Sequence, residues 1–220
     1  TEEQEALIRW RLGQEHLLPL TGAKIAWQGF PLHEAGGERA QGVLVVTIQE
    51  AILRQYESLC ESVGLLPQEV GVTSFQLFNL WLKAAGGWKR LGRDLLWVRV
   101  SDGGLTAFDM REGGVAFVRT KLLSAEGLQG EEVPDGELVD NIVEECAVSL
   151  RACREHHPGL SVTEVVLAGD SPFPMLEQAL NRELGLSVER LDWEAVERVG
   201  WRHNGGSTTW ATLPVVAGVM

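Results

Sequence analysis

The chain has no long apolar run and no excess of basic residues. None of its stretches approaches the roughly 18 apolar residues that a membrane-spanning helix needs, and the stretch from Thr1 to Glu5 is acidic where a signal peptide would be basic. With 19 Lys and Arg against 31 Asp and Glu, the formal net charge is −12. Nucleic acids and anionic lipid surfaces attract basic proteins. The composition therefore predicts a cytoplasmic protein that binds no nucleic acid and does not insert into a membrane.

Cysteine is also scarce. The chain has three, Cys60, Cys146 and Cys153. The last two lie two turns apart on one predicted helix, about 10 Å along its axis, which is too far for a disulfide. No spacing of Cys and His is typical of a zinc site. We expect reduced, buried thiols and no metal.

The first part of the chain mixes helices and strands. Turn residues and apolar periodicity predict helices over residues 2–16, 49–63 and 73–86, and strands over 24–30, 43–48 and 70–72. We expect 43–48 to be a buried strand and residues 31–42 to be a loop. Gly64 is the expected C-cap of the second helix, and Thr73 or Ser74 the expected N-cap of the third.

The second part predicts three strands, a helix, a strand, a helix and a last strand. Their predicted ranges are 95–100, 105–110, 115–119, 137–156, 162–168, 173–184 and 186–191. This order is typical of the ribonuclease-H-like fold, and two such lobes make an actin-like ATPase. The predicted fold class is thus α/β, an actin-like lobe with an inserted α/β subdomain. We divide the chain into residues 1–72 (inserted subdomain and return to the first lobe), 73–94 (helix and linker) and 95–220 (second lobe).

Two turns are candidates for a nucleotide site. In an actin-like lobe the turn between the first two strands holds phosphate, which here is Ser101-Asp102-Gly103-Gly104. The turn after the fourth strand lies beside the nucleoside, which here is Gly169-Asp170-Ser171. The alternatives are an ordinary tight turn for the first and a helix start for the second, with Ser171 as N-cap. The sequence contains no P-loop motif.

Several segments, in a fixed order along nearly the whole chain, resemble one family. They are Ile8 to Leu20, a helix followed by a proline; Val43 to Tyr56 with Gly64 to Pro67; Val70 to Leu77; Trp97 to Arg119; Val165 to Gly169; and Leu213 to Val219. The family they resemble is that of PilM, the actin-like cytoplasmic component of type IV pilus assembly. The cytoplasmic domain of the type II secretion L protein is a close second. The chain begins after the family's opening strands and first phosphate loop.

The resemblance implies a nucleotide site from which this chain departs. The family's second phosphate loop reads roughly Val-Asp-Ile-Gly-Ala-Ser, so Arg99 takes the place of its Asp and Ser101 the place of its Gly. Asp170 takes the place of the second glycine of the adenosine loop. ATP and Mg²⁺ are the cofactors that the fold implies. Because of these departures we expect a degenerate site, no resident cofactor and no catalysis.

The resemblance also implies a partner. PilM-like proteins hold the cytoplasmic amino-terminal peptide of an inner-membrane protein, PilN, beside the inserted subdomain, which would place the docking surface in residues 1–72. We therefore predict a cytoplasmic scaffold, peripheral at the inner membrane through its partners, and leave homo-oligomerisation open. One alternative is an actin-like ATPase or kinase that uses Asp102 and Gly169. Another is an interaction domain unrelated to pili.

Overall fold

The structure is a computed structural model with two compact units. It describes residues 2–14, 20–33, 39–68, 70–84, 92–101, 104–111, 114–123, 135–156, 161–169 and 173–191. Of these, the residues up to Val70 form the first unit and those from Gly71 on form the second. No helix within the described ranges is long and apolar enough to cross a membrane.

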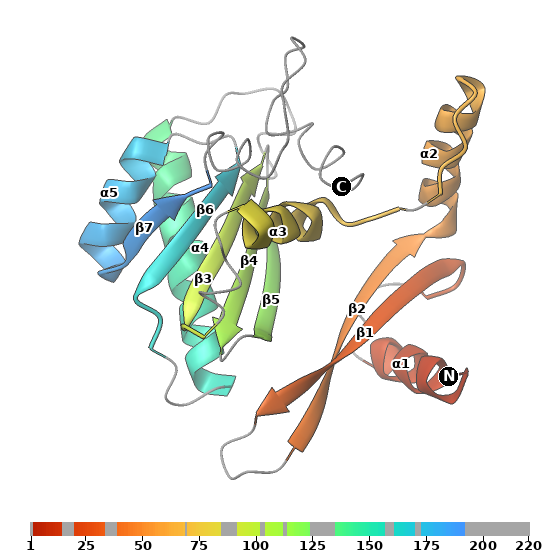
Figure 1. Ribbon diagram of the computed structural model, residues 1–220, viewed down its shortest axis with the longest axis horizontal. Coiled ribbons are helices and arrows are strands. Elements are labelled where there is room, and N and C mark those ends of the chain that lie inside the picture. The colour runs from red at the N-terminus through yellow and green to blue at the C-terminus, as the bar shows by residue number, and fades with distance from the viewer. Residues whose placement is uncertain are drawn as a thin grey trace. The chain divides into compact units, whose positions relative to one another are not determined.

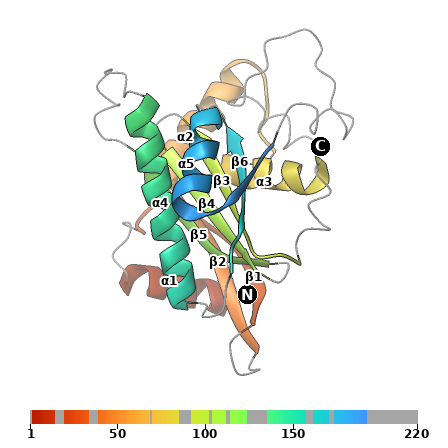
Figure 2. The ribbon, with the colours of Figure 1, turned by 90° about the vertical axis from the view of Figure 1, so that its left-hand side faces the viewer.

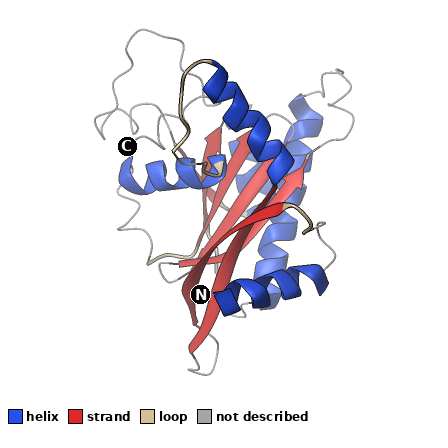
Figure 3. Ribbon diagram, turned by 90° about the vertical axis from the view of Figure 1, so that its right-hand side faces the viewer, coloured by secondary structure: helices blue, strands red, loops and turns tan. Residues whose placement is uncertain are grey.

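The first unit is built on a two-stranded antiparallel ribbon. Strand β1 (Ala23–His33) pairs with β2 (Arg39–Gln49) along its whole length, and Figure 3 shows the two long strands. The predicted strands are confirmed but are longer than expected. The predicted loop over residues 31–42 is wrong, because both of its ends continue the ladder.

The prediction that residues 43–48 form a buried strand is also wrong. Val43 is exposed and the next five residues are half-buried. In a two-stranded ribbon each strand has one neighbour and the sheet is too narrow to enclose a core. The β-branched residues of this run therefore remain partly open to solvent.

Two helices belong to the first unit, α1 (Glu2–Gln14) and α2 (Glu50–Ser62). The end of α2 is a Schellman motif: Gly64 N–H donates to the Glu61 carbonyl and Leu65 N–H to the Cys60 carbonyl. Gly64 has a φ of +78°, which glycine adopts without strain. The predicted C-cap is confirmed.

The second unit contains a five-stranded mixed sheet. Its strands are β3 (Leu95–Ser101), β4 (Gly104–Arg111), β5 (Gly114–Leu122), β6 (Glu164–Gly169) and β7 (Ser187–Arg190). The spatial order is β5-β4-β3-β6-β7. The first three form an antiparallel meander, and β6 and β7 run parallel to β3. The predicted order of elements is confirmed.

Helices cover both faces of this sheet. Helices α4 (Asp135–His156) and α5 (Phe173–Leu184) pack on one face and α3 (Thr73–Ala84) on the other (Figures 1 and 2). Along β3, Leu96 and Val98 face α4 and α5. Trp97 points to the other face, where it belongs to the same core cluster as the fully buried Trp81 of α3. A strand buried on both faces reads as a continuous apolar run, which explains the run from Leu95 to Val98 at the start of β3.

The start of α3 differs from the prediction. The Val72 carbonyl accepts hydrogen bonds from the backbone N–H groups of Phe75 and Gln76, so Val72 occupies the capping position. Ser74 lies inside the first turn and uses its hydroxyl elsewhere. The predicted strand over residues 70–72 is wrong: these residues are not in a strand, because no described strand pairs with them.

Candidate functional site

The carboxyl ends of β3 and β6 lie side by side at one edge of the sheet. The two strands are parallel, and their register pairs Val100 with Gly169. The chain turns after β3 to enter β4, with Ser101 opposite Gly104. In open α/β sheets, ligands bind outside the carboxyl ends of parallel strands. Among the described residues, Ser101, Gly104 and Gly169 therefore form the candidate site.

Gly169 is the most constrained of the three. Its φ is +124°, and a Cβ added there would overlap the carbonyl oxygen of Val100 and lie 2.9 Å from the carbonyl carbon. Only a residue without a side chain permits this approach. By contrast, the nearest atoms to a Cβ at Gly104 are 3.7 Å away. The glycine of the second predicted turn is thus required by the backbone itself.

A row of polar side chains crosses the α3 face of the sheet near this edge. Arg99 on β3 donates from Nη1 to the Ser74 hydroxyl at 3.4 Å, and Ser74 donates to Thr106 Oγ1 on β4 at 3.1 Å. The hydroxyl oxygens of Thr106 and Thr120 on β5 are 3.4 Å apart. The row connects the start of α3 to three strands. Sequence reasoning identified Arg99 only; the signal for Thr106 was one polar position within a buried apolar strand.

A carboxyl group is buried on the opposite face, beneath α4. Asp109 on β4 has no exposed surface, and its carboxyl oxygens contact no hydrogen-bond donor among the described residues except the Cys153 thiol, a weak one. Desolvation raises the pKa of Asp109 to about 7. Sequence reasoning missed this residue, although it is the one acid in the apolar run from Leu105 to Met110.

Two thiols of α4 share this environment. Desolvation, followed by the charge of Asp109, raises the pKa of Cys146 and of Cys153 to about 12. Both side chains are buried. They are therefore neutral thiols at physiological pH, as expected for structural cysteines. The third cysteine, Cys60 on α2, is only half-buried, so the expectation that it is buried is wrong.

Comparison with known proteins found matches among solved structures and none among family models or curated sequences. No protein-family model matches the chain, and no curated protein matches it. A chain of the solved PilM–PilN type IV pilus biogenesis complex matches with a TM-score of 0.63 at 21% identity, covering 88% of this chain and 63% of that one. A Bacteroides thetaiotaomicron protein of actin-like ATPase fold and unknown function matches with a TM-score of 0.47 at 13% identity, covering 92% and 66%. The match to the PilM–PilN chain shows the fold, which is the actin-like fold that the sequence resemblance implied.

The predicted fold class and the resemblance to PilM are confirmed at the level of the fold. The chain spans about 63% of the length of the matched PilM–PilN chain. That the turns after β3 and β6 face a nucleotide, as the resemblance implies, stays a prediction. The structure brings Ser101 and Gly104 of the first turn close to Gly169 of the second. The other predicted site residues, Asp102, Gly103, Asp170 and Ser171, lie outside the described residues.

The described residues at this edge do not fit a magnesium nucleotide. Mg²⁺ takes oxygen ligands from carboxylates and phosphates, whereas β3 has Arg99 where the family resemblance implies an acid. The Arg99 guanidinium is a donor only, and it donates to Ser74. Within the described ranges, no three side chains of His, Cys, Asp or Glu gather as a metal site. The expectation of no cofactor remains a prediction.

Proposed function

We propose that this chain is a cytoplasmic scaffold of a type IV pilus or type II secretion assembly at the inner membrane, which docks the amino-terminal peptide of a PilN-like membrane protein. The observation that carries the proposal is the match of 88% of the chain to the PilM–PilN complex with a TM-score of 0.63. Arg99, in place of a metal-binding acid, favours docking without ATP hydrolysis.

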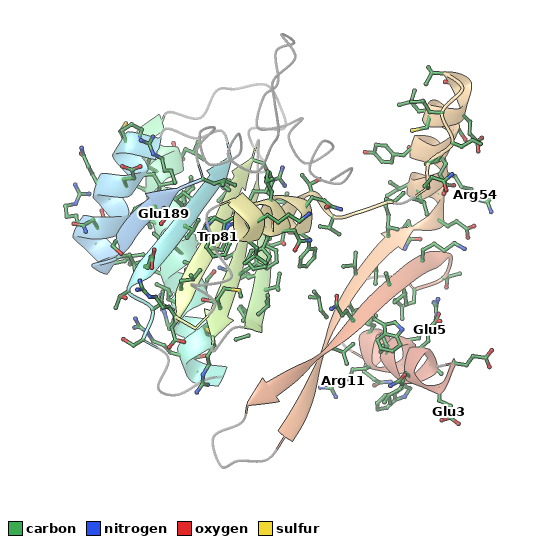
Figure 4. The ribbon with its side chains drawn as sticks, viewed as in Figure 1. Glu3, Glu5, Arg11, Arg54, Trp81 and Glu189 are labelled. Atoms are coloured by element: carbon green, nitrogen blue, oxygen red, sulfur yellow. The ribbon has the colours of Figure 1, made fainter. Side chains whose placement is uncertain are left out.

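The first unit offers the edge that an extended peptide needs. Within the described residues β1 and β2 pair only with each other, so each strand has an outer edge outside the ladder. Such edges accept an added strand through main-chain hydrogen bonds. The first turn of α1 carries Glu2, Glu3 and Glu5 (Figure 4 labels the last two). This acidic turn suits a basic juxtamembrane peptide.

The test is isothermal titration calorimetry with the cytoplasmic amino-terminal peptide of the PilN-like protein encoded beside this chain. We expect micromolar affinity that weakens as salt is raised, because screening reduces the attraction between an acidic unit and a basic peptide. A peptide of the same composition in scrambled order is the control. Equal affinity for both peptides, or no binding by either, would contradict the proposal.

Hydrogen exchange with the same peptide tests the location. Strand addition to the ribbon should slow amide exchange in β1 or β2, since their outer N–H groups gain acceptors. The edge strand β5 of the five-stranded sheet is the internal control and should be unchanged. Slower exchange in β5 alone would place the peptide on the second unit.

The alternative function, an actin-like ATPase or kinase, is favoured by Gly169, because the backbone requires a glycine at the carboxyl end of β6, next to Val100 of β3. It requires that Mg–ATP raise the melting temperature and that Asp102→Ala abolish the rise. We expect no rise. A rise that depends on Asp102 would replace the scaffold proposal with the enzyme.

A further inference from the structure

Helix α2 carries an apolar stripe that is open to solvent. The stripe, hereafter the α2 stripe, recurs at the spacing of one helix face and consists of Ile52, Tyr56 and Leu59 within the helix and of Val63 at its C-cap. Their exposed fractions are 45%, 63%, 65% and 68%, and no residue of α2 is buried. Leu65 and Leu66, directly after the helix, expose 62% and 76%. Clusters of this kind mark interaction sites in proteins.

The stripe is not the side through which α2 contacts its own unit. The residues within the helix that are half-buried on that side are Leu53, Glu57 and Cys60. At 100° per residue, this side lies roughly a quarter of a turn around the helix from the α2 stripe. An amphipathic helix normally turns its apolar stripe to the core. Here the more apolar side is left without a partner among the described residues.

The borders of the α2 stripe are uncharged. Gln55 and Ser62 flank it on one side, and both are exposed. The charged residues lie further around the helix, where Arg54 pairs with Glu50 at 2.7 Å (Figure 4 labels Arg54). A basic partner would be recognised by acids bordering the stripe. The surface therefore fits an apolar, uncharged partner surface.

We propose that the α2 stripe is a dimer interface that two copies of this chain share. With typical side-chain areas, the four stripe residues with Leu65 and Leu66 expose on the order of 700 Å², close to the roughly 800 Å² that each partner buries in a standard interface. A two-fold axis sets this apolar patch against itself, so that no charge is buried. Two chains of net charge −12 repel each other. An interface made of the uncharged α2 stripe adds no further repulsion at the contact.

Sedimentation equilibrium of the full chain, over a hundredfold range of concentration, measures the dimer. We expect wild type to dimerise and Leu59→Glu to weaken dimerisation at least ~30-fold, because the contact would bury an unpaired carboxylate. Ser58→Glu is the matched control: it adds the same charge at the next exposed position, off the stripe, and should change the affinity less than ~3-fold. Equal urea midpoints for both variants would show that each is folded.

A monomeric wild type at every concentration would overturn the proposal, and so would equal weakening by both variants. Tyr56 is the only tyrosine of the chain, so ring-labelled tyrosine gives one NMR signal from within the stripe. That signal should shift with concentration in wild type and Ser58→Glu but not in Leu59→Glu. Added salt should strengthen the dimer, because it screens the repulsion between the two negatively charged chains. A dimer that weakens with salt would contradict an apolar interface. Peptide docking is measured separately and does not depend on this outcome.

Discussion

Gly169 lies against the backbone of Val100 so closely that no side chain fits between the two strands. The register pairs the two residues across β3 and β6, and an added Cβ would overlap the Val100 carbonyl oxygen. The carboxyl ends of β3 and β6 are therefore in direct main-chain contact at the candidate site.

Replacing Gly169 by Ala should destabilise the second unit strongly. The change adds a Cβ at a φ of +124° and forces β3 and β6 apart, so we expect a loss of about 3 kcal/mol or more in the free energy of unfolding. Urea denaturation measures it. Gly185→Ala is the control, because its φ is also positive, +67°, but nothing lies within 4 Å. That variant should lose about 1 kcal/mol, and equal losses would contradict the close contact.

Asp109 should make the stability depend on pH. Its pKa is raised to about 7 from an ordinary value of 3.8 because the carboxyl is desolvated. Between these values Asp109 keeps its proton in the folded state and releases it in the unfolded state. The contribution of Asp109 to the free energy of unfolding is therefore fully present below about pH 4 and is lost as pH rises to about 7. We expect a loss of about 2–4 kcal/mol over this range.

The Asp109→Asn variant isolates this effect. It removes the titrating group, so urea denaturation across the pH range should show a flatter profile and a higher stability than wild type at pH 8. Asp140→Asn, an exposed site on α4, is the control and should keep the wild-type profile. A wild-type slope in Asp109→Asn would show that other groups cause it.

Thiol reactivity should separate the three cysteines. Burial and the raised pKa of Cys146 and Cys153 leave almost no thiolate at pH 8. A disulfide reagent should therefore modify Cys60 first in the folded chain, and all three thiols in urea. Mass mapping of the modified residue checks this. Early labelling of Cys153 would show that α4 opens readily from the sheet.

The hydroxyl of Ser74 should contribute to the packing of α3 on the sheet. Ser74→Ala removes the hydrogen bond to Thr106 and leaves Arg99 without this acceptor, so we expect a loss of about 1–2 kcal/mol. Asn79→Ala, exposed on the same helix, should change stability by less than about 0.5 kcal/mol. A similar small change at Ser74 would mean that water replaces its partners.

Local chemistry made much of the fold predictable. The turn at Gly64 and the bounds of α5 follow from glycine C-caps and apolar periodicity, and these are properties of a few neighbouring residues. The error over residues 31–42 has a local cause too. Pro31 and several glycines are typical of loops, but here the cross-strand ladder of β1 and β2 extends through both ends.

By itself, the sequence determined the order of strands and helices, the net charge, and the presence of Arg99 where an acid is expected. Only the tertiary structure decided what these residues contact. Arg99 meets Ser74 from 25 positions away, Asp109 becomes a buried acid because α4 covers β4, and the amphipathic α2 turns its apolar side outward. Periodicity specifies that a helix has an apolar face, but burial depends on which elements pack against that face.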